Sequence, residues 1–170
     1  MLFTNLVEDY KDLYLRDIAR ASSAAPYYFY PYTFDKYICV DGGLSLNNPS
    51  LGACSLVKKI LKRDDIAVVS IGTGSFEIPL KPDDMCYINP INFISNLIDS
   101  FMDGNSDTTE EISINVLEEN YIRFQPKIKR NNTDLDNVSD TNIKALEEIA
   151  KEYMISKEIY KKLELLKKLY

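Results

Sequence analysis

Residues 36–50 read KYICVDGGLSLNNPS, and this stretch decides the fold. Its first five residues predict a short strand, and the pair Gly42-Gly43 predicts a tight turn. A helix is expected next, because Asn48 is a good N-cap and Pro49 suits the first helical position. A strand, a tight turn and a helix in direct succession are typical of α/β proteins.

Strands and helices continue to alternate on both sides of this step. The residue patterns predict helices over 12–25, 48–63, 91–102 and 107–119, with a weak point at Gly104, and a long helix from Asp140 with Ser139 as N-cap. They predict strands over 36–40, 66–71 and 121–125, and an aromatic loop over 27–32. The apolar run IAVVSI at 66–71 is typical of a parallel strand covered on both faces. The order predicts α/β architecture with a largely parallel sheet.

Composition excludes several classes of function. The 170 residues suit one compact domain. The net charge of -6 gives no basic surface for phosphates, so no nucleic-acid partner is expected. The chain has no histidine, which excludes a Ser-His-Asp or Cys-His mechanism within it and also His-ligated metals.

No metal site or cofactor is expected. Asp134, Asp136 and Asp140 lack the glycine and the terminal glutamate of an EF-hand loop. The three cysteines, Cys39, Cys54 and Cys86, form no C-x-x-C pair and indicate free thiols in a reducing compartment. The N-terminus becomes charged too soon for a signal peptide, and no apolar run has the length of a membrane span. These observations favour a cytoplasmic location.

Five blocks of sequence resemble, in order and spacing, the patatin-like phospholipase family. They are ARASSAAPYYF at 19–29, DGGLSLNNP at 41–49, VSIGTG at 69–74, YIRFQP at 121–126 and DLDNVSDTNIKAL at 134–146. The resemblance covers the chain from about Phe3 to Glu152. Each block is modest by itself, and the five together are specific.

The resemblance implies a lipid acyl hydrolase with a three-layer α/β/α fold and a Ser-Asp dyad. Asp41 matches the family's catalytic aspartate and would accept the proton of the serine hydroxyl. The residues that would support this motif are Gly42, Gly43, Asn47, Asn48 and Pro49. The implied substrate is a phospholipid or another acyl lipid, with no cofactor and with peripheral membrane contact allowed. A dyad of this kind needs no imidazole, which agrees with the absence of histidine.

The chain departs from the family pattern at the nucleophile. No G-x-S-x-G occurs in it, because the nearest string, GLSLN at 43–47, lacks the last glycine. The glycine-rich oxyanion loop is also missing, and only 18 residues precede the ARASSAAP block. Ser22 and Ser23 lie in a predicted helix, where packing is the expected role. Residues 1–170 are therefore interpreted as the C-terminal portion of a family domain that lacks its nucleophile half. In one hypothesis, a separate N-terminal chain that carries G-x-S-x-G completes the domain.

Three hypotheses stay open. The chain is a hydrolase fragment that supplies the dyad aspartate, a non-catalytic remnant that binds lipid or a partner protein, or an unrelated α/β binding domain. An apolar stripe over 91–102 bears on whether the chain binds lipid. Such stripes are typically core, but a missing half-domain would leave part of this one uncovered and able to contact lipid.

Overall fold

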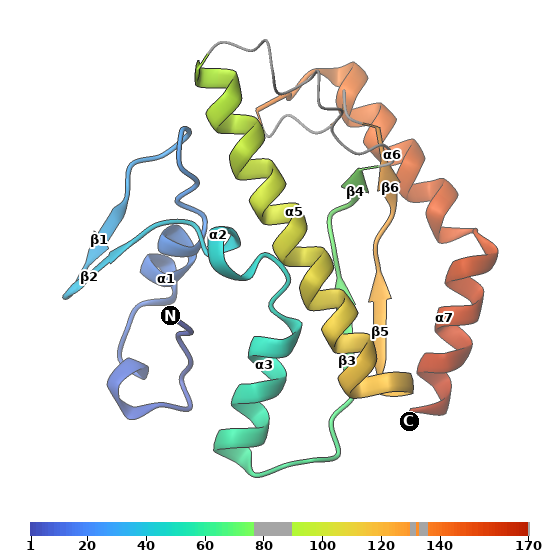
Figure 1. Ribbon diagram of the computed structural model, residues 1–170, viewed down its shortest axis with the longest axis horizontal. Helices are drawn as coiled ribbons and strands as arrows, with labels where there is room; N and C mark the ends of the chain where they lie inside the picture. Colours follow the sequence, from blue (N-terminus) through green and yellow to red (C-terminus); the bar gives the residue numbers. More distant parts are fainter. Residues whose placement is uncertain (77–89, 130–131, 133–135, 170) are drawn as a thin grey trace. The chain divides into compact units, whose positions relative to one another are not determined.

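The computed structural model describes residues 1–76, 90–129, 132 and 136–169, and shows a mixed α/β chain (Figure 1). The helices are α1 (Leu15–Ser22), α2 (Gly43–Leu46), α3 (Ser50–Leu56), α5 (Pro90–Leu117), α6 (Asp140–Met154) and α7 (Lys157–Lys168). The strands are β1 (Tyr32–Phe34), β2 (Tyr37–Cys39), β3 (Val68–Ile71), β4 (Ser75–Phe76), β5 (Tyr121–Phe124) and β6 (Lys127–Ile128). Short 3-10 turns cover Glu8–Tyr10 and Glu118–Asn120, and Val57–Leu61 forms a π-helical turn.

The chain forms two compact units. The first comprises Met1–Asp65 and Ile88–Ile112, and the second comprises Ile66–Tyr87 and Ser113–Tyr170. Within the described residues the strands form three two-stranded sheets, in which β1 and β2 are antiparallel and the pairs β3–β5 and β4–β6 are parallel. The α/β class is thus confirmed in its coarse form, with small and partly parallel sheets.

In the first unit, a hairpin follows α1 where the sequence predicts a loop and a lone strand. Strands β1 and β2 pair in the register Tyr32↔Cys39 and Phe34↔Tyr37. Asp35 adopts a left-handed conformation with φ 49° in the two-residue turn, which is the geometry that tight hairpins require. The aromatic loop is therefore shorter than predicted, because its last residue, Tyr32, already belongs to β1.

Aromatic rings form the core around this hairpin. The ring of Phe3 lies 5.2 Å from Tyr10, 5.7 Å from Phe34 and 5.2 Å from Tyr37, measured between centroids. Offset and edge-on pairs of this kind stabilise a small core beyond the area they bury. The core fixes the hairpin against the N-terminal residues and so fixes the strand that leads to the Asp-Gly-Gly turn.

In the second unit, two of the sequence blocks lie side by side. Val68 pairs with Tyr121 and Ile71 with Phe124, so VSIGTG and YIRFQP run in parallel. The Gln125 side-chain amide donates to the Gly74 carbonyl at 2.8 Å, and the Arg123 guanidinium donates to the Ser70 hydroxyl at 2.6 Å. The predicted strands at 66–71 and 121–125 and their parallel arrangement are confirmed.

Strand β3 is not covered on both faces, which corrects the prediction from its apolar run. Ile71 is 80% exposed, and Val69 on the same face is also exposed. Ile122, the partner of Val69 on β5, is only 3% exposed. Helix α7 contacts β5 and buries Ile159, so the helical cover lies over β5 (Figure 1).

Several helix boundaries differ from the prediction. Helix α5 runs without a break through Gly104, because one glycine costs a helix interior only about 1 kcal/mol and 28 residues share that cost. The long C-terminal helix is divided at Ile155, since the Ser156 hydroxyl accepts the Ile159 N–H and starts α7. The first helical segment is α1, Leu15–Ser22, within the predicted 12–25.

The remaining boundaries follow from capping. The Ser139 hydroxyl accepts the Asn142 N–H at 3.3 Å, which confirms this residue as the N-cap of α6. Helix α3 begins at Ser50, one residue later than predicted. Asn48 nevertheless acts as a side-chain cap, because its Oδ1 accepts the Ser50 N–H at 3.2 Å.

Candidate functional site

Asp41 lies two residues beyond the end of β2, in the first unit. Its main-chain N–H donates to the Ala24 carbonyl at 2.9 Å, and the N–H of Gly42 donates to the Ser22 carbonyl at 3.1 Å. Ala21 and Ala24 are buried beside these bonds. The small residues at the end of α1 let the Asp-Gly-Gly backbone approach closely, so the blocks ARASSAAP and DGG are joined through their main chains.

The carboxylate of Asp41 holds its own turn. Its Oδ1 accepts the Gly43 N–H at 2.6 Å, which is an Asx-type turn. The carboxylate makes no other hydrogen bond to the part of the chain that the structure describes. Oδ1 is therefore committed to the turn, while Oδ2 is available to accept a proton.

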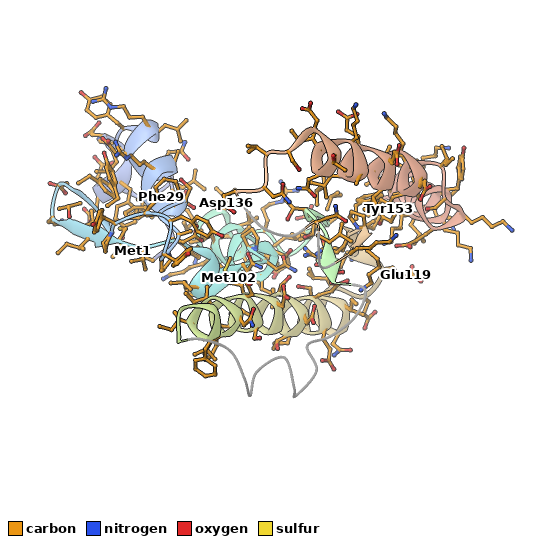
Figure 2. All side chains as sticks on the ribbon, turned by 90° about the horizontal axis from the view of Figure 1, so that it is seen from above. Met1, Phe29, Met102, Glu119, Asp136 and Tyr153 are labelled. Carbon is orange, nitrogen blue, oxygen red and sulfur yellow. The ribbon has the colours of Figure 1, made fainter. Side chains whose placement is uncertain are left out.

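Of the two glycines, Gly43 is the more closely surrounded, by the ends of two side chains. A Cβ at Gly43 would lie 2.5 Å from the Met102 Cε and 2.8 Å from the Asp41 Oδ1. At Gly42 the nearest such atom is the Ser22 Oγ at 3.6 Å, which is ordinary contact. Figure 2 labels Met102 on α5, the helix that closes over Gly43.

The segment Asn47-Asn48-Pro49 is tied to α5. The Asn47 side-chain amide donates to the Met102 carbonyl at 3.2 Å, and its main-chain N–H donates to the Asn105 Oδ1 at 3.2 Å. Asn105 in turn donates to the Ser45 carbonyl at 2.9 Å. Asn48 is buried and caps α3, and Pro49 is exposed. Asn105 is a positioning residue that the sequence patterns do not reveal, since nothing local marks its partners.

A pocket of about 500 Å³ opens beside Asp41 within the first unit. Its walls are mainly apolar, and Asp41 carries the only charged side chain among its lining residues; the apolar side chains include Leu2, Ile18, Val40, Leu44 and Leu46. A mainly apolar pocket with few polar groups is the usual form of a site for small ligands.

Ser22 is the last residue of α1, and Ser23 is the C-cap that follows it. The Ser23 hydroxyl donates to the Ala19 carbonyl at 3.0 Å, a bond to the last turn of the helix. Ser22 lines the pocket at the last position of α1, and no hydrogen bond joins it to Asp41 in the described residues. Neither serine stands on a strand-to-helix elbow.

Neither a cluster of metal ligands nor a membrane-spanning helix is found in the described ranges. No group of three or more Cys, Asp or Glu residues is gathered there as a metal site would need. None of the helices in those ranges combines the length and the apolar character that crossing a bilayer requires. Cys39 and Cys54 are half-buried free thiols. Cys86 and Asp134 lie outside the described residues.

Helix α5 carries three aspartates spaced four residues apart, Asp99, Asp103 and Asp107. Burial raises the pKa of Asp103 to about 6, and the carboxylates of Asp107 and Asp99 add to the rise. Because the folded chain then binds this proton more tightly than the unfolded chain does, the free energy of unfolding should increase as the pH falls through about 6.

Asp103→Asn is expected to remove this pH dependence. The variant should also be more stable at pH 7 by about 1 kcal/mol, a figure reduced from the full pKa shift because solvent screens a partly exposed group. Urea denaturation of both proteins at about pH 5 and pH 7 measures the effect. Equal slopes against pH in the two proteins would contradict the assignment to Asp103.

Comparison with known proteins finds similar sequences. The family model of the patatin-like phospholipases matches residues 2–53, the range that contains α1, the hairpin and Asp41. The calcium-independent phospholipase A2-gamma of Mus musculus is 36% identical over 133 residues, which is 75% of this chain and 16% of that protein. This chain belongs to the patatin-like phospholipase family.

Plant patatin-like proteins are also similar to it. The probable inactive patatin-like protein 9 of Arabidopsis thaliana is 31% identical over 130 residues, covering 67% of this chain and 34% of that protein. Patatin-like protein 2 of Oryza sativa subsp. indica is 29% identical over 152 residues, covering 68% of this chain and 37% of that protein. The chain thus matches about a sixth to a third of the length of these patatin-like relatives.

Proposed function

We propose that this chain supplies the aspartate of a patatin-like Ser-Asp dyad that hydrolyses the ester bonds of phospholipids or other acyl lipids. Residues 1–170 would form the C-terminal portion of a three-layer α/β/α domain, and the serine would come from a segment carrying G-x-S-x-G. The observation that carries the proposal is Asp41, whose backbone is hydrogen-bonded just beyond the C-terminal end of α1 and which lines a mainly apolar pocket.

In this mechanism the chain contributes one group to the reaction, a general base. Asp41 Oδ2 would accept the proton of the serine hydroxyl while the serine Oγ attacks the ester carbonyl. As the tetrahedral intermediate collapses, that proton passes to the departing alcohol and an acyl-serine is left. Water then attacks the acyl-serine while Asp41 accepts a proton from it, and that proton returns to the serine Oγ as the fatty acid is released. The stabilisation of the oxyanion would come from outside these 170 residues.

Support comes from the way the site is braced. Gly43 is closely surrounded by the ends of the Met102 and Asp41 side chains, and its N–H donates to Asp41 Oδ1. Asn47 and Asn105 join the segment after the motif to α5. A base whose backbone and one oxygen are fixed needs little reorganisation when it accepts a proton, which is what efficient general-base catalysis requires. The likeness to the phospholipase A2-gamma proteins supports a lipid ester as the substrate class.

A hydrolysis assay tests the proposal. The purified chain alone is expected to leave p-nitrophenyl esters and phosphatidylcholine vesicles intact, because no G-x-S-x-G serine is present. Co-expression with a patatin-like N-terminal segment that carries G-x-S-x-G is expected to produce hydrolysis. Turnover by the chain alone that is lost in Asp41→Ala would contradict the shared dyad, as would an assembled complex without activity.

A non-catalytic role is the second candidate. It is favoured by the bond from Gly43 to Asp41, which gives the carboxylate a structural task, and by the similarity to an Arabidopsis protein named as probably inactive. Binding of lipid or of a partner protein that survives Asp41→Asn, without hydrolysis in the assembled complex, would support this role.

A further inference from the structure

We propose that the aromatic loop formed by residues 27–31 is a membrane-docking surface that inserts into the headgroup region of a phospholipid bilayer. The loop reads YYFYP and joins α1 to β1. Its chemistry points to a lipid interface, and its position in the first unit places it beside the residues that anchor Asp41. This surface does not depend on the dyad, because none of its contacts involves the Asp41 carboxylate.

The rings of this loop face solvent although a folded chain normally buries them. Tyr30 is 94% exposed and Phe29 is 65% exposed, and Tyr27 is exposed as well. Figure 2 labels Phe29 in this segment. Exposed aromatic side chains in a contiguous run are uncommon on a free protein surface and typically mark an interaction site.

The loop presents these rings on an ordered backbone. The N–H of Phe29 donates to the Ala25 carbonyl at 2.8 Å, and the N–H of Tyr28 donates to the same oxygen at 3.2 Å. The rings of Tyr27 and Tyr28 meet edge-on at 5.2 Å. Little ordering entropy would therefore be lost when the rings enter another phase.

Tyrosine and phenylalanine together fit the headgroup region better than a dry protein core. A tyrosine ring is apolar along its body and polar at its hydroxyl, so it rests where hydrocarbon meets water. The loop contains three tyrosines and one phenylalanine. A protein partner with a dry interface would have to satisfy each hydroxyl separately, whereas the hydrated headgroups satisfy all of them.

A cationic group accompanies the rings. A recess of about 300 Å³ is lined by Arg20 and by loop residues that include Phe29 and Tyr30. The guanidinium of Arg20 lies 4.8 Å from the ring centroid of Tyr32, which also lines this recess. An arginine in an aromatic recess is complementary to a lipid phosphate. Every phospholipid carries that phosphate, so binding should not require an anionic headgroup in a chain with net charge -6.

A tryptophan reporter gives a direct test. The chain contains no tryptophan, so Phe29→Trp introduces a single fluorophore into the loop. With phosphatidylcholine vesicles, with or without added phosphatidylserine, its emission is expected to shift to the blue. Tyr160→Trp is the matched control, because Tyr160 is 62% exposed on α7 and lies outside the loop. Its emission is expected to stay constant.

Vesicle co-sedimentation provides the second measurement. Replacing Phe29 and Tyr30 together by serine is expected to weaken partitioning by about tenfold or more, since each buried ring contributes apolar area. Tyr160→Ser and Asp41→Asn are expected to leave it unchanged, and the latter separates this surface from the proposed dyad. Circular dichroism checks that each variant is folded.

Three outcomes would overturn the proposal. The first is equal shifts for the reporters at 29 and 160, and the second is no shift at either position. The third is a shift at position 29 that needs a G-x-S-x-G-bearing protein segment and does not occur with vesicles. That last result would show the aromatic loop to be a protein interface.

Discussion

Replacing Asp41 by asparagine is expected to lower ester hydrolysis by the assembled dyad by about 10²–10⁴-fold, the usual contribution of a general base. The change is nearly isosteric and removes only the charge and the basicity. An asparagine Oδ1 still accepts the Gly43 N–H that the carboxylate now holds at 2.6 Å. The turn should therefore persist, and the free energy of unfolding should change by less than about 1 kcal/mol.

The control for Asp41→Asn is Asp35→Asn. Asp35 lies in the turn of the hairpin that leads to Asp41, is exposed, and has a positive φ that asparagine tolerates well. Its replacement is expected to leave both hydrolysis and stability unchanged. Initial rates of phosphatidylcholine hydrolysis and urea denaturation of each variant separate the two effects. A rate that is insensitive to Asp41→Asn would exclude Asp41 as the base.

Ile122→Ala is expected to lower the free energy of unfolding by about 3 kcal/mol, because the side chain is buried and its removal leaves a cavity. Ile122 is 3% exposed on β5, paired with Val69 of β3. The helical cover of α7 over β5 restricts how far the surroundings can collapse into the space.

Ile71→Ala removes the same atoms from the neighbouring strand and serves as the matched control. Ile71 lies opposite Phe124 and is 80% exposed, so its loss should cost less than about 1 kcal/mol. Far-UV circular dichroism during urea denaturation measures both variants. Similar losses for the two would mean that β3 and β5 are covered alike when the protein is in solution.

Local signals in the sequence predicted the features that depend on neighbours along the chain. The run at 66–71 and the alternation at 121–125 gave strands, because β-branched and aromatic residues fit a pleated backbone. Ser139 gave the start of α6, because a hydroxyl can accept a helix N–H three residues later. The parallel pairing of β3 with β5 followed from the helices that intervene between them.

Features that depend on distant partners could not be predicted in this way. Strand β1, the antiparallel partner of β2, was not predicted, because Tyr32–Phe34 directly follows an aromatic run that contains a proline. Asn105 gave no local sign that it would hold Ser45 and Asn47. The exposure of Ile71 could not be predicted either, because the sequence does not show whether another element covers an apolar residue.

The Asp-Gly-Gly motif of the candidate site could be predicted from the sequence, but the contacts that hold it in place could not. The position of Asp41 just after a strand followed from the Asp-Gly-Gly turn, but the bonds from its backbone to α1 did not. The close contact between position 43 and the Met102 side chain was apparent only from the structure. The catalytic role of Asp41 stays a prediction.

The bare face of β3 also has a consequence for how the chain behaves at high concentration. The window AVVSI at 67–71 contains no charge and no proline, and such windows are prone to intermolecular cross-β stacking. Just before it in sequence stand Arg63, Asp64 and Asp65, with Lys58 paired to Asp64 at 2.8 Å and Arg63 to Asp65. These exposed ion pairs add little to the stability of the fold. Charged residues that flank an aggregation-prone strand nevertheless oppose its association with other copies of the chain. Their value would lie in keeping copies of the chain apart.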